Sequence, residues 1–279
     1  MRVTRPSRII SDMLCITLTF AVIGLFLFPV VWLVISSLKP LSLLFSTRIT
    51  LFGFEPTFGY YRQIFHVGFL RFVFNSVLVS IVATGFCMLL AFPAAYAFSR
   101  FRFLGKTLCF GFFGLTQIFP WIILVTPIFI IFFFLGLSNS YSGLILIYAA
   151  VGIPFTTYML YGYLEAVPKE IDDAAVIDGC STIRTIVYVI VPIAVPGLVA
   201  SATYAFILAW NEFLFALTLI TTTEKKTAPV ALATFFGEYG ANWGEVLAAA
   251  TVTTIPTLIF FLLLQRHLLK GLTAGSVKQ

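Results

Sequence analysis

Charged residues are scarce in this sequence. They make up 10% of its 279 residues, whereas soluble domains carry about 25%. Apolar residues reach 60%, against about 45–50% in soluble domains. A water-soluble fold could not bury so many apolar side chains, so the bilayer must be the solvent for most of the chain. The composition therefore predicts an integral membrane protein.

Histidine and cysteine are also rare. His66 and His267 stand alone, and the four cysteines, Cys15, Cys87, Cys109 and Cys180, show no CxxC spacing. A free cysteine beside or within an apolar span behaves as a small hydrophobe. We therefore expect no metal, no disulfide and no catalytic residue, because nothing in the spans combines a nucleophile with a base.

A phosphate-binding loop is missing as well. Gly105-Lys106-Thr107 ends like one, but Arg100 stands where the motif needs its first glycine, and no strand precedes it. We expect no cofactor in this chain, so that any ATP hydrolysis takes place on a partner. The net charge of +6 does not indicate nucleic acid either, because the basic residues form short clusters between apolar runs. The expected surroundings are membrane lipid.

Six apolar stretches are long enough to cross a bilayer, for which a helix needs about 20 mostly apolar residues. They are residues 13–36, 72–99, 108–135, 142–163, 193–220 and 246–265. The first is longer than the core of a signal peptide and lacks a cleavage site after it, so we interpret it as a retained span. The sequence thus predicts an all-α polytopic protein with six transmembrane helices in a single domain, residues 1–279.

Lysine and arginine in the loops predict the orientation. Eleven of them lie on one side of the six spans: Arg2, Arg5, Arg8, Arg100, Arg102, Lys106, Lys169, Arg184, Arg266, Lys270 and Lys278. The other six lie on the opposite side. Both termini fall on the richer side, so both are predicted to be cytoplasmic, together with the loop at residues 164–192.

This loop predicts two short helices outside the membrane core. Glu170, Asp172 and Asp173 place negative charge at the N-terminal end of the first helix, and Gly179 suits the left-handed position that ends it. Ser181 can cap the second helix. On physical grounds alone, the loop is either a knob that docks on a cytoplasmic partner or an ordinary amphipathic connector.

The spacing of this loop resembles the EAA loop of ABC importer membrane subunits. The family pattern is Glu-Ala-Ala, three residues, Gly, nine residues, Ile, one residue, Leu-Pro. Here Asp173-Ala174-Ala175 is followed at that spacing by Gly179, Val189 and Val191-Pro192. The sequence departs from the pattern at three positions. Asp173 replaces Glu and keeps the charge, and Val189 and Val191 replace Ile and Leu and keep the apolar character.

Further motifs resemble the MalG-like permease subunits of carbohydrate ABC importers. They are Asn75-Ser76 and residues 94–103 in the second span, Trp210-Asn211-Glu212-Phe213 in the fifth, and the tail at residues 270–278. The resemblance implies a bacterial inner-membrane permease subunit that forms half of the translocation path of an ATP-driven sugar importer. The implied mechanism is alternating access. The implied partners are a second, MalF-like permease, two copies of an ATPase subunit that bind ATP and Mg²⁺, and an extracytoplasmic sugar-binding protein.

The resemblance and the polar residues within the spans together give the candidate site residues. The resemblance assigns coupling to the ATPase to a helix of the cytoplasmic EAA loop, with Glu170, Asp173, Ala174, Ala175, Asp178 and Gly179 as candidates. Glu212 is a candidate for the path or gate, because an ionisable residue in a span faces the bundle interior or a water-filled cavity by default. Trp210 and Asn211 beside it, and Gln117 in the third span, are the other path candidates. A structural hydrogen-bond cluster at 210–212 and ordinary helix packing at Gln117 are the alternatives.

Two other functions remain open. The EAA spacing also fits ABC importers of non-sugar solutes, such as amino acids or phosphate esters. An ion-coupled secondary transporter would be expected to show acid or base pairs in its spans and internal repeats. The sequence offers one such Glu and no convincing repeat, which disfavours that class.

Overall fold

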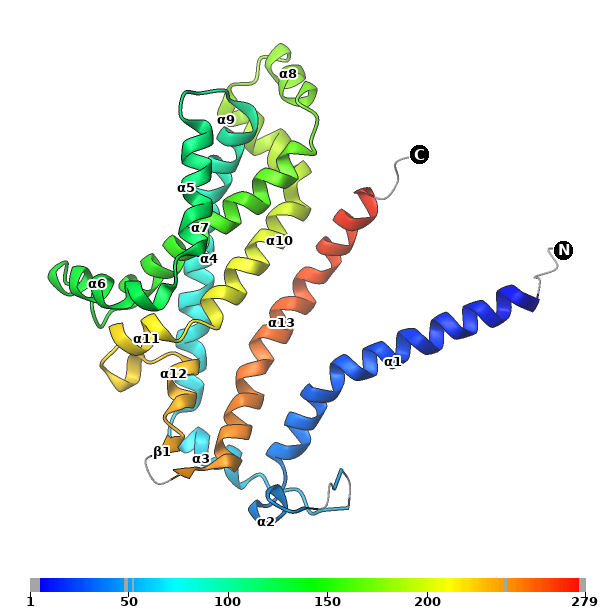
Figure 1. Ribbon diagram of the computed structural model, residues 1–279, viewed down its shortest axis with the longest axis vertical. Helices are drawn as coiled ribbons and strands as arrows, with labels where there is room; N and C mark the ends of the chain where they lie inside the picture. The colour runs from blue at the N-terminus through cyan, green and yellow to red at the C-terminus, as the bar shows by residue number, and fades with distance from the viewer. Residues whose placement is uncertain (1–5, 48–49, 52, 238–239, 276–279) are drawn as a thin grey trace. The chain divides into compact units, whose positions relative to one another are not determined.

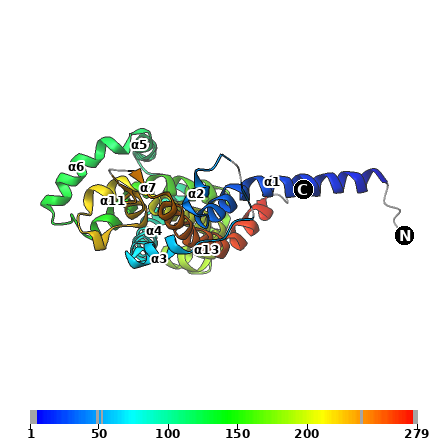
Figure 2. The same cartoon turned by 90° about the horizontal axis from the view of Figure 1, so that it is seen from below.

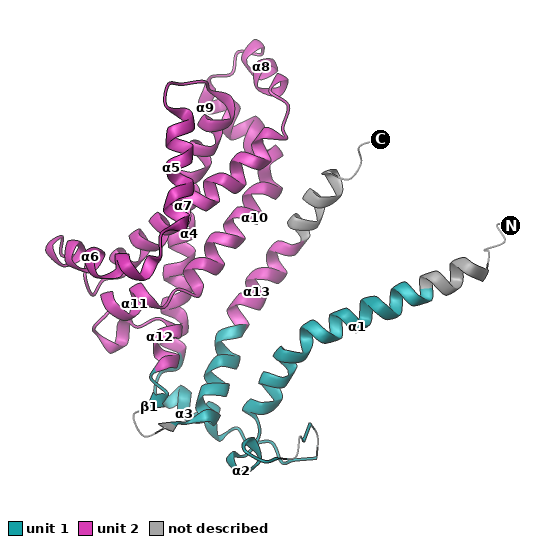
Figure 3. Ribbon diagram, viewed as in Figure 1, with its two compact units in different colours: residues 1–69, 234–254 teal, residues 70–233, 255–279 magenta. Residues whose placement is uncertain are grey.

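The computed structural model of this chain consists almost entirely of helices (Figure 1). It describes the backbone of residues 6–47, 50, 51, 53–237 and 240–275, and the side chains of residues 13–47, 50, 51, 53–237 and 241–265. These residues form two compact units, residues 1–69 with 234–254 and residues 70–233 with 255–279 (Figure 3). The single domain stays a prediction.

The first unit contains the N-terminal helix and the segments that follow it. Its elements are α1 (Pro6–Ser37), α2 (Leu41–Leu44), α3 (Gly59–His66), the strands β1 (Phe236–Gly237) and β2 (Gly240–Ala241), and the start of α13 (Trp243–Gly275). The strands pair antiparallel, with Phe236 opposite Ala241. The hydroxyl groups of Ser37 and Tyr61, 2.6 Å apart, join the end of α1 to α3.

The second unit is a bundle around α7. Its elements are α4 (Phe69–Arg100), α5 (Lys106–Ile118), α6 (Trp121–Phe134), α7 (Tyr141–Glu165), α8 (Glu170–Ile177), α9 (Thr182–Arg184), the π-helix η1 (Thr185–Ile190), α10 (Val191–Trp210), α11 (Leu214–Leu219), the 3₁₀ turn η2 (Thr223–Lys225) and α12 (Ala228–Ala233). In α7 the fully buried Leu144 belongs to a core cluster with Val79 and Leu219, while Leu160 packs with Ala91 and Ala194. Apolar burial therefore joins α4, α7, α10 and α11.

Within the described part of the chain, five helices are long and apolar enough to cross a membrane. They are Met13–Ser37, Phe69–Arg100, Tyr141–Glu165, Thr182–Trp210 and Trp243–Gln265. The pair α5 and α6 provides a sixth span if the two helices together count as one. The all-α, polytopic fold class predicted from the sequence is confirmed. Arg2, Arg5 and Lys278, on which part of the predicted orientation depends, lie outside the described residues.

The predicted third span, residues 108–135, consists of two helices, α5 and α6, joined at a sharp bend. The chain bends by 101° between α5 and α6, and Figures 1 and 2 show α6 turned away from the axis of α5. The cause is Pro120, because a proline disfavours the helical conformation of the residue before it. Phe119 accordingly has ψ of 128°, which ends α5, and the helix restarts at Trp121.

The predicted fifth span, residues 193–220, also needs correction. Its helix begins earlier, at Thr182, and ends at Trp210. Residues 211–213 interrupt the helix before α11 starts. The hydrophobicity that continues to residue 220 hides this break, because apolar composition does not report where a backbone turns.

Candidate functional site

The first helix of the loop at residues 164–192 forms where the sequence predicts it. Glu170, Asp172 and Asp173 lie in the first turn of α8, where the helix dipole favours negative charge. Lys169 occupies the N-cap position and makes no side-chain capping bond. The acids therefore stabilise the helix start through charge.

The end of α8 depends on Gly179, which has φ of 80°. Its N–H donates to the carbonyl oxygen of Val176 at 3.0 Å, and the N–H of Cys180 donates to that of Ala175 at 2.9 Å. These two bonds form a Schellman ending, in which a left-handed residue satisfies the last helical carbonyls. The predicted left-handed conformation of Gly179 is confirmed.

The outer surface of α8 combines apolar and acidic side chains. Val176 is 62% exposed and Ile177 is 86% exposed, and Ile183 on α9 adds a third exposed apolar side chain. The other exposed residues of the segment include Glu170, Asp173, Ala174, Asp178 and Gly179. Figure 1 shows α8 beyond the ends of α5, α7 and α10. An exposed apolar patch with polar neighbours is typical of a surface that docks on another protein.

The inner side of α8 is held by an ion pair. Nε of Arg100, the last residue of α4, lies 2.9 Å from Oδ2 of Asp172. The two side chains are only 5% and 14% exposed. Nη1 of Arg100 also donates to the carbonyl oxygen of Leu164 at 3.0 Å, and Nη2 donates to that of Val167 at 3.2 Å. One guanidinium group thus joins the ends of α4 and α7 to the start of α8.

Further hydrogen bonds extend this cluster. The Tyr96 hydroxyl donates to Oδ1 of Asp172 at 2.7 Å, so both carboxylate oxygens have partners. The hydroxyl of Ser99 donates to Oε1 of Glu165 at 2.8 Å and accepts a bond from Arg100. Tyr96, Ser99 and Arg100 lie on the last turns of α4, and we call these three residues with Glu165 and Asp172 the Arg100 cluster.

A cavity of about 290 Å³ lies beside the Arg100 cluster. Tyr96, Arg100 and Asp172 line it together with Lys169 and Asp173. Charges of both signs therefore face the same small space. A cavity with such balanced charge is a poor site for either a free anion or a free cation.

The second helix predicted in the loop is not a separate element. Ser181 stands at the N-cap of α9, but its side chain makes no capping hydrogen bond. After three α-helical residues the backbone widens into η1, which continues directly into α10. Pro192, the second residue of α10, directly follows this π-helical stretch. The loop is thus connected to α10 by continuous helix.

The candidates at 210–212 lie at the break between α10 and α11. Trp210 is 3% exposed and stacks on Phe206, with ring centroids 5.8 Å apart. Nδ2 of Asn211 donates to the carbonyl oxygen of Ile207 at 2.9 Å. The carboxylate of Glu212 accepts bonds from the N–H groups of Phe215, at 2.8 Å, and Ala216, at 3.1 Å. Glu212 therefore caps the start of α11.

Gln117 lies at the end of α5, just before the bend at Pro120. Its Nε2 is buried and has no hydrogen-bond partner among the described residues. A buried donor without a partner is costly, so a group that accepts its hydrogen bond would bind favourably there. The structure does not bring Gln117 and residues 210–212 together into one site.

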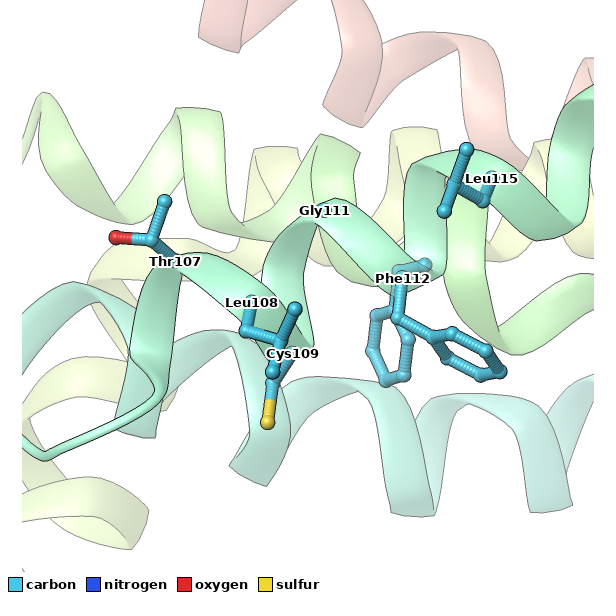
Figure 4. Close-up of a pocket in the computed structure, with 7 residues that line it drawn as sticks. Thr107, Leu108, Cys109, Gly111, Phe112 and Leu115 are labelled. Atoms are coloured by element: carbon cyan, nitrogen blue, oxygen red, sulfur yellow. The ribbon is translucent and has the colours of Figure 1, made fainter.

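A cavity of about 980 Å³ on α5 has an almost entirely apolar lining. Figure 4 shows its lining on α5, which consists of Thr107, Leu108, Cys109, Gly111, Phe112, Phe113 and Leu115. The Thr107 hydroxyl is the polar group of this side-chain set. A sugar needs several hydrogen-bonding partners, whereas this surface suits lipid or another apolar helix.

Two asparagines on the opposite end of the bundle were not candidates in the sequence. Nδ2 of Asn75 donates to the carbonyl oxygens of Glu224, at 2.9 Å, and Lys226, at 3.0 Å. Asn139, with φ of 52°, accepts from the N–H of Thr222 at 3.1 Å, and Nζ of Lys225 donates to its carbonyl oxygen at 2.7 Å. These bonds fix the segment between α11 and α12 to α4 and to the turn before α7.

The family model for the inner membrane component of binding-protein-dependent transport systems matches residues 87–274, which is more than half of the chain and includes α8 and Gly179. The chain belongs to this family. The resemblance predicted from the sequence is confirmed, and this family member with several apolar spans is a multi-pass inner-membrane protein and a permease subunit rather than an enzyme.

Similar permeases are found in several organisms. The trehalose transport system permease protein SugB of Mycobacterium tuberculosis is 40% identical over 92% of this chain and 94% of its own length. The diacetylchitobiose uptake system permease protein DasC of Streptomyces coelicolor is 35% identical, with 94% and 95% covered. The trehalose/maltose transport system permease protein MalG of Thermococcus litoralis is 35% identical, with 90% and 91% covered.

Solved structures share the fold. A chain of a bacterial ABC transporter involved in the import of the acidic polysaccharide alginate superposes with a TM-score of 0.75. It is 21% identical, and the match covers 95% of this chain and 99% of that one. The MetNI methionine ABC transporter gives a TM-score of 0.60 at 18% identity, with 71% and 94% covered. At these identities the likeness concerns the fold alone.

Proposed function

We propose that the chain is the permease subunit of an ATP-driven sugar importer and forms half of its translocation path. The observation that carries the proposal is the family match together with relatives named for trehalose, maltose and diacetylchitobiose. Each of these relatives aligns over nearly its whole length. The fold does not decide the solute, because it is shared with transporters named for alginate and for methionine.

The ATPase docks on the exposed surface of α8 in this proposal. The apolar side chains of Val176 and Ile177 fill a groove, and Glu170, Asp173 and Asp178 pair with basic groups around it. Ala174 leaves room for close approach. Ala175, which is 6% exposed, faces inward and supports the helix.

The complete importer then contains several chains. A second, MalF-like permease supplies the other half of the path, two ATPase subunits bind ATP and Mg²⁺, and an extracytoplasmic sugar-binding protein delivers the solute. Both termini of this chain and the loop at 164–192 are cytoplasmic. Closure of the ATPase dimer moves α8, and the spans switch between inward-open and outward-open packings whose relative stability the partners change.

The sugar path includes the break at residues 211–213. Asn211 and Glu212 offer amide and carboxylate groups there, and Gln117 offers a buried amide without a partner. The Glu212 carboxylate already accepts two backbone bonds, which supports a structural role in addition. Trp210 can stack on a sugar only in a state that uncovers its ring, because that ring packs against Phe206.

Co-purification tests the assembly. The tagged chain is purified in mild detergent, the accompanying proteins are identified, and ATP hydrolysis is measured. We expect an ATPase subunit and a second permease. A stable, folded preparation without any ATPase would refute the proposal and favour an ion-coupled transporter.

Uptake measurements test the solute class. Cells with and without this chain are compared for uptake of radiolabelled trehalose, maltose, diacetylchitobiose and methionine. A difference confined to one or more sugars supports the proposal. A difference for methionine alone would show that the chain belongs to an importer of a non-sugar solute.

A further inference from the structure

We propose that Arg100 is a positioning residue that holds α8 on the end of α4 through Asp172, so that α4 moves together with α8. The proposal rests on the proposed function, because α8 is moved by an ATPase docked on it. It concerns a different surface from the docking surface. Asp172 faces inward toward α4, whereas Glu170, Asp173 and Asp178 are exposed.

A displacement of α8 reaches α7 and α10 by a different kind of connection from the one that reaches α4. Residues 166–169 connect α8 to α7, and the chain runs from α8 through α9 and η1 into α10. Continuous backbone therefore transmits a displacement of α8 to α7 and α10. No backbone of this kind joins α8 to α4, because α4 ends 70 positions earlier in the chain, at Arg100. Side-chain contacts must carry the motion to α4.

Among the described residues, the polar contacts between α4 and α8 converge on Asp172. Nε of Arg100 lies 2.9 Å from one carboxylate oxygen, and the Tyr96 hydroxyl donates to the other at 2.7 Å. The hydrogen bond from Tyr96 fixes the orientation of the carboxylate, and the ion pair with Arg100, which lacks hydrogen-bond geometry, holds it by charge.

Arg100 is itself fixed by other parts of the unit. Nη1 and Nη2 donate to the carbonyl oxygens of Leu164 and Val167, at and just beyond the end of α7, where helical carbonyls lack partners within the helix. The side chain is 5% exposed, so its charge is shielded from water and screening ions. A buried pair fixed in this way resists separation, because removing one partner leaves an unpaired charge. The contact is therefore stiff enough to transmit a displacement.

The experiment measures solute transport and ATP hydrolysis by the complete importer in proteoliposomes. The variants are Arg100→Gln, Asp172→Asn and the double variant, with Arg102→Gln as the control because Arg102 is an exposed cation two residues away. We expect each single variant to lower transport per ATP hydrolysed by roughly tenfold, a size typical of coupling between distant sites. The ATPase should still co-purify and hydrolyse ATP, and Arg102→Gln should behave as the wild type.

The double variant shows whether Arg100 and Asp172 affect coupling through their mutual contact or independently of each other. If the two residues act through one contact, the double variant loses no more coupling than the worse single variant. Coupling that stays at the wild-type level in both single variants would overturn the proposal. So would losses that multiply in the double variant.

The variant Tyr96→Phe tests whether the contacts of Asp172 serve to position α8 or to fold the protein. It removes one hydrogen bond to Asp172 and keeps the ring, so we expect an assembled importer with a smaller loss of coupling. If Tyr96→Phe and Arg100→Gln both abolish assembly, the contact serves folding and the proposal is wrong. If no ATPase co-purifies with the wild-type chain, the proposed importer function is refuted. This result is obtained before any variant is made, so it is distinguishable from a failure of the Arg100 proposal.

Discussion

The hydroxyl of Tyr141 donates a hydrogen bond of 2.9 Å to Oδ1 of Asn75, and this bond sets the direction in which the Asn75 amide nitrogen points. The nitrogen then donates to the carbonyl oxygens of Glu224 and Lys226. Asn75 is itself only 4% exposed. One side chain of α4 therefore holds α7 and the segment between α11 and α12.

Asn75→Ala should destabilise the protein by about 1 kcal/mol, because a buried side chain that makes three hydrogen bonds is lost. Thermal unfolding in detergent measures this, and faster amide hydrogen exchange at residues 221–227 would locate the effect. Asn211→Ala is the control, since Asn211 is exposed and its amide bonds to a carbonyl on its own helix. Equal unfolding temperatures for Asn75→Ala and wild type would contradict the structural role.

Gly179→Asp should uncouple ATP hydrolysis from transport while leaving the protein in the membrane. The matched variant is Gly179→Asn, because Asn and Asp have nearly the same shape and both tolerate the left-handed conformation. Any added Cβ meets nothing within 4 Å, so space is not the obstacle. Measured as transport per ATP hydrolysed, the Asp variant should lose more than the Asn variant. Equal losses would assign the effect to the backbone and not to the added charge.

Glu212→Ala should lower stability by about 1 kcal/mol, because the start of α11 loses the acceptor for two N–H groups. Glu212→Gln keeps one acceptor oxygen and should lose less. Thermal unfolding measures how much the Glu212 cap contributes to stability, and the KM for the transported sugar measures any contribution of Glu212 to sugar binding in the path. A changed KM at unchanged stability would show that Glu212 serves the path and not the helix.

Gly197→Ala should disturb the packing of α7 against α10. A Cβ at Gly197 would lie 2.4 Å from Cγ of Tyr163, at the base of a ring that cannot move without its whole side chain. Overpacking of this kind costs about 1–3 kcal/mol. Gly162→Ala is the control on α7, because its Cβ meets nothing within 4 Å. Thermal unfolding in detergent should separate the two variants, and equal stability would show that α7 and α10 adjust freely.

Much of the structure of the loop at residues 164–192 could be predicted from the sequence, because the residues that determine it act locally. Acids in a first turn and a glycine at the left-handed end act on their own helix, and α8 forms between them at Glu170–Ile177. The Arg100 cluster could not be predicted in this way. Arg100 and Asp172 are far apart in sequence, and each has an adequate local explanation, as a basic residue at a membrane boundary and as an acid at a helix start.

The sequence by itself determined the membrane class, the number and approximate place of the apolar segments, and the family. These properties depend on composition, on hydrophobic length and on short motifs, none of which needs a distant partner. The tertiary structure alone decided that the chain bends at Pro120, that the helix stops at Trp210, and that Asp172, among several neighbouring acids, turns inward to Arg100. Backbone direction and side-chain partners are set by packing between segments far apart in the chain, and hydropathy is the same for a straight helix and a broken one.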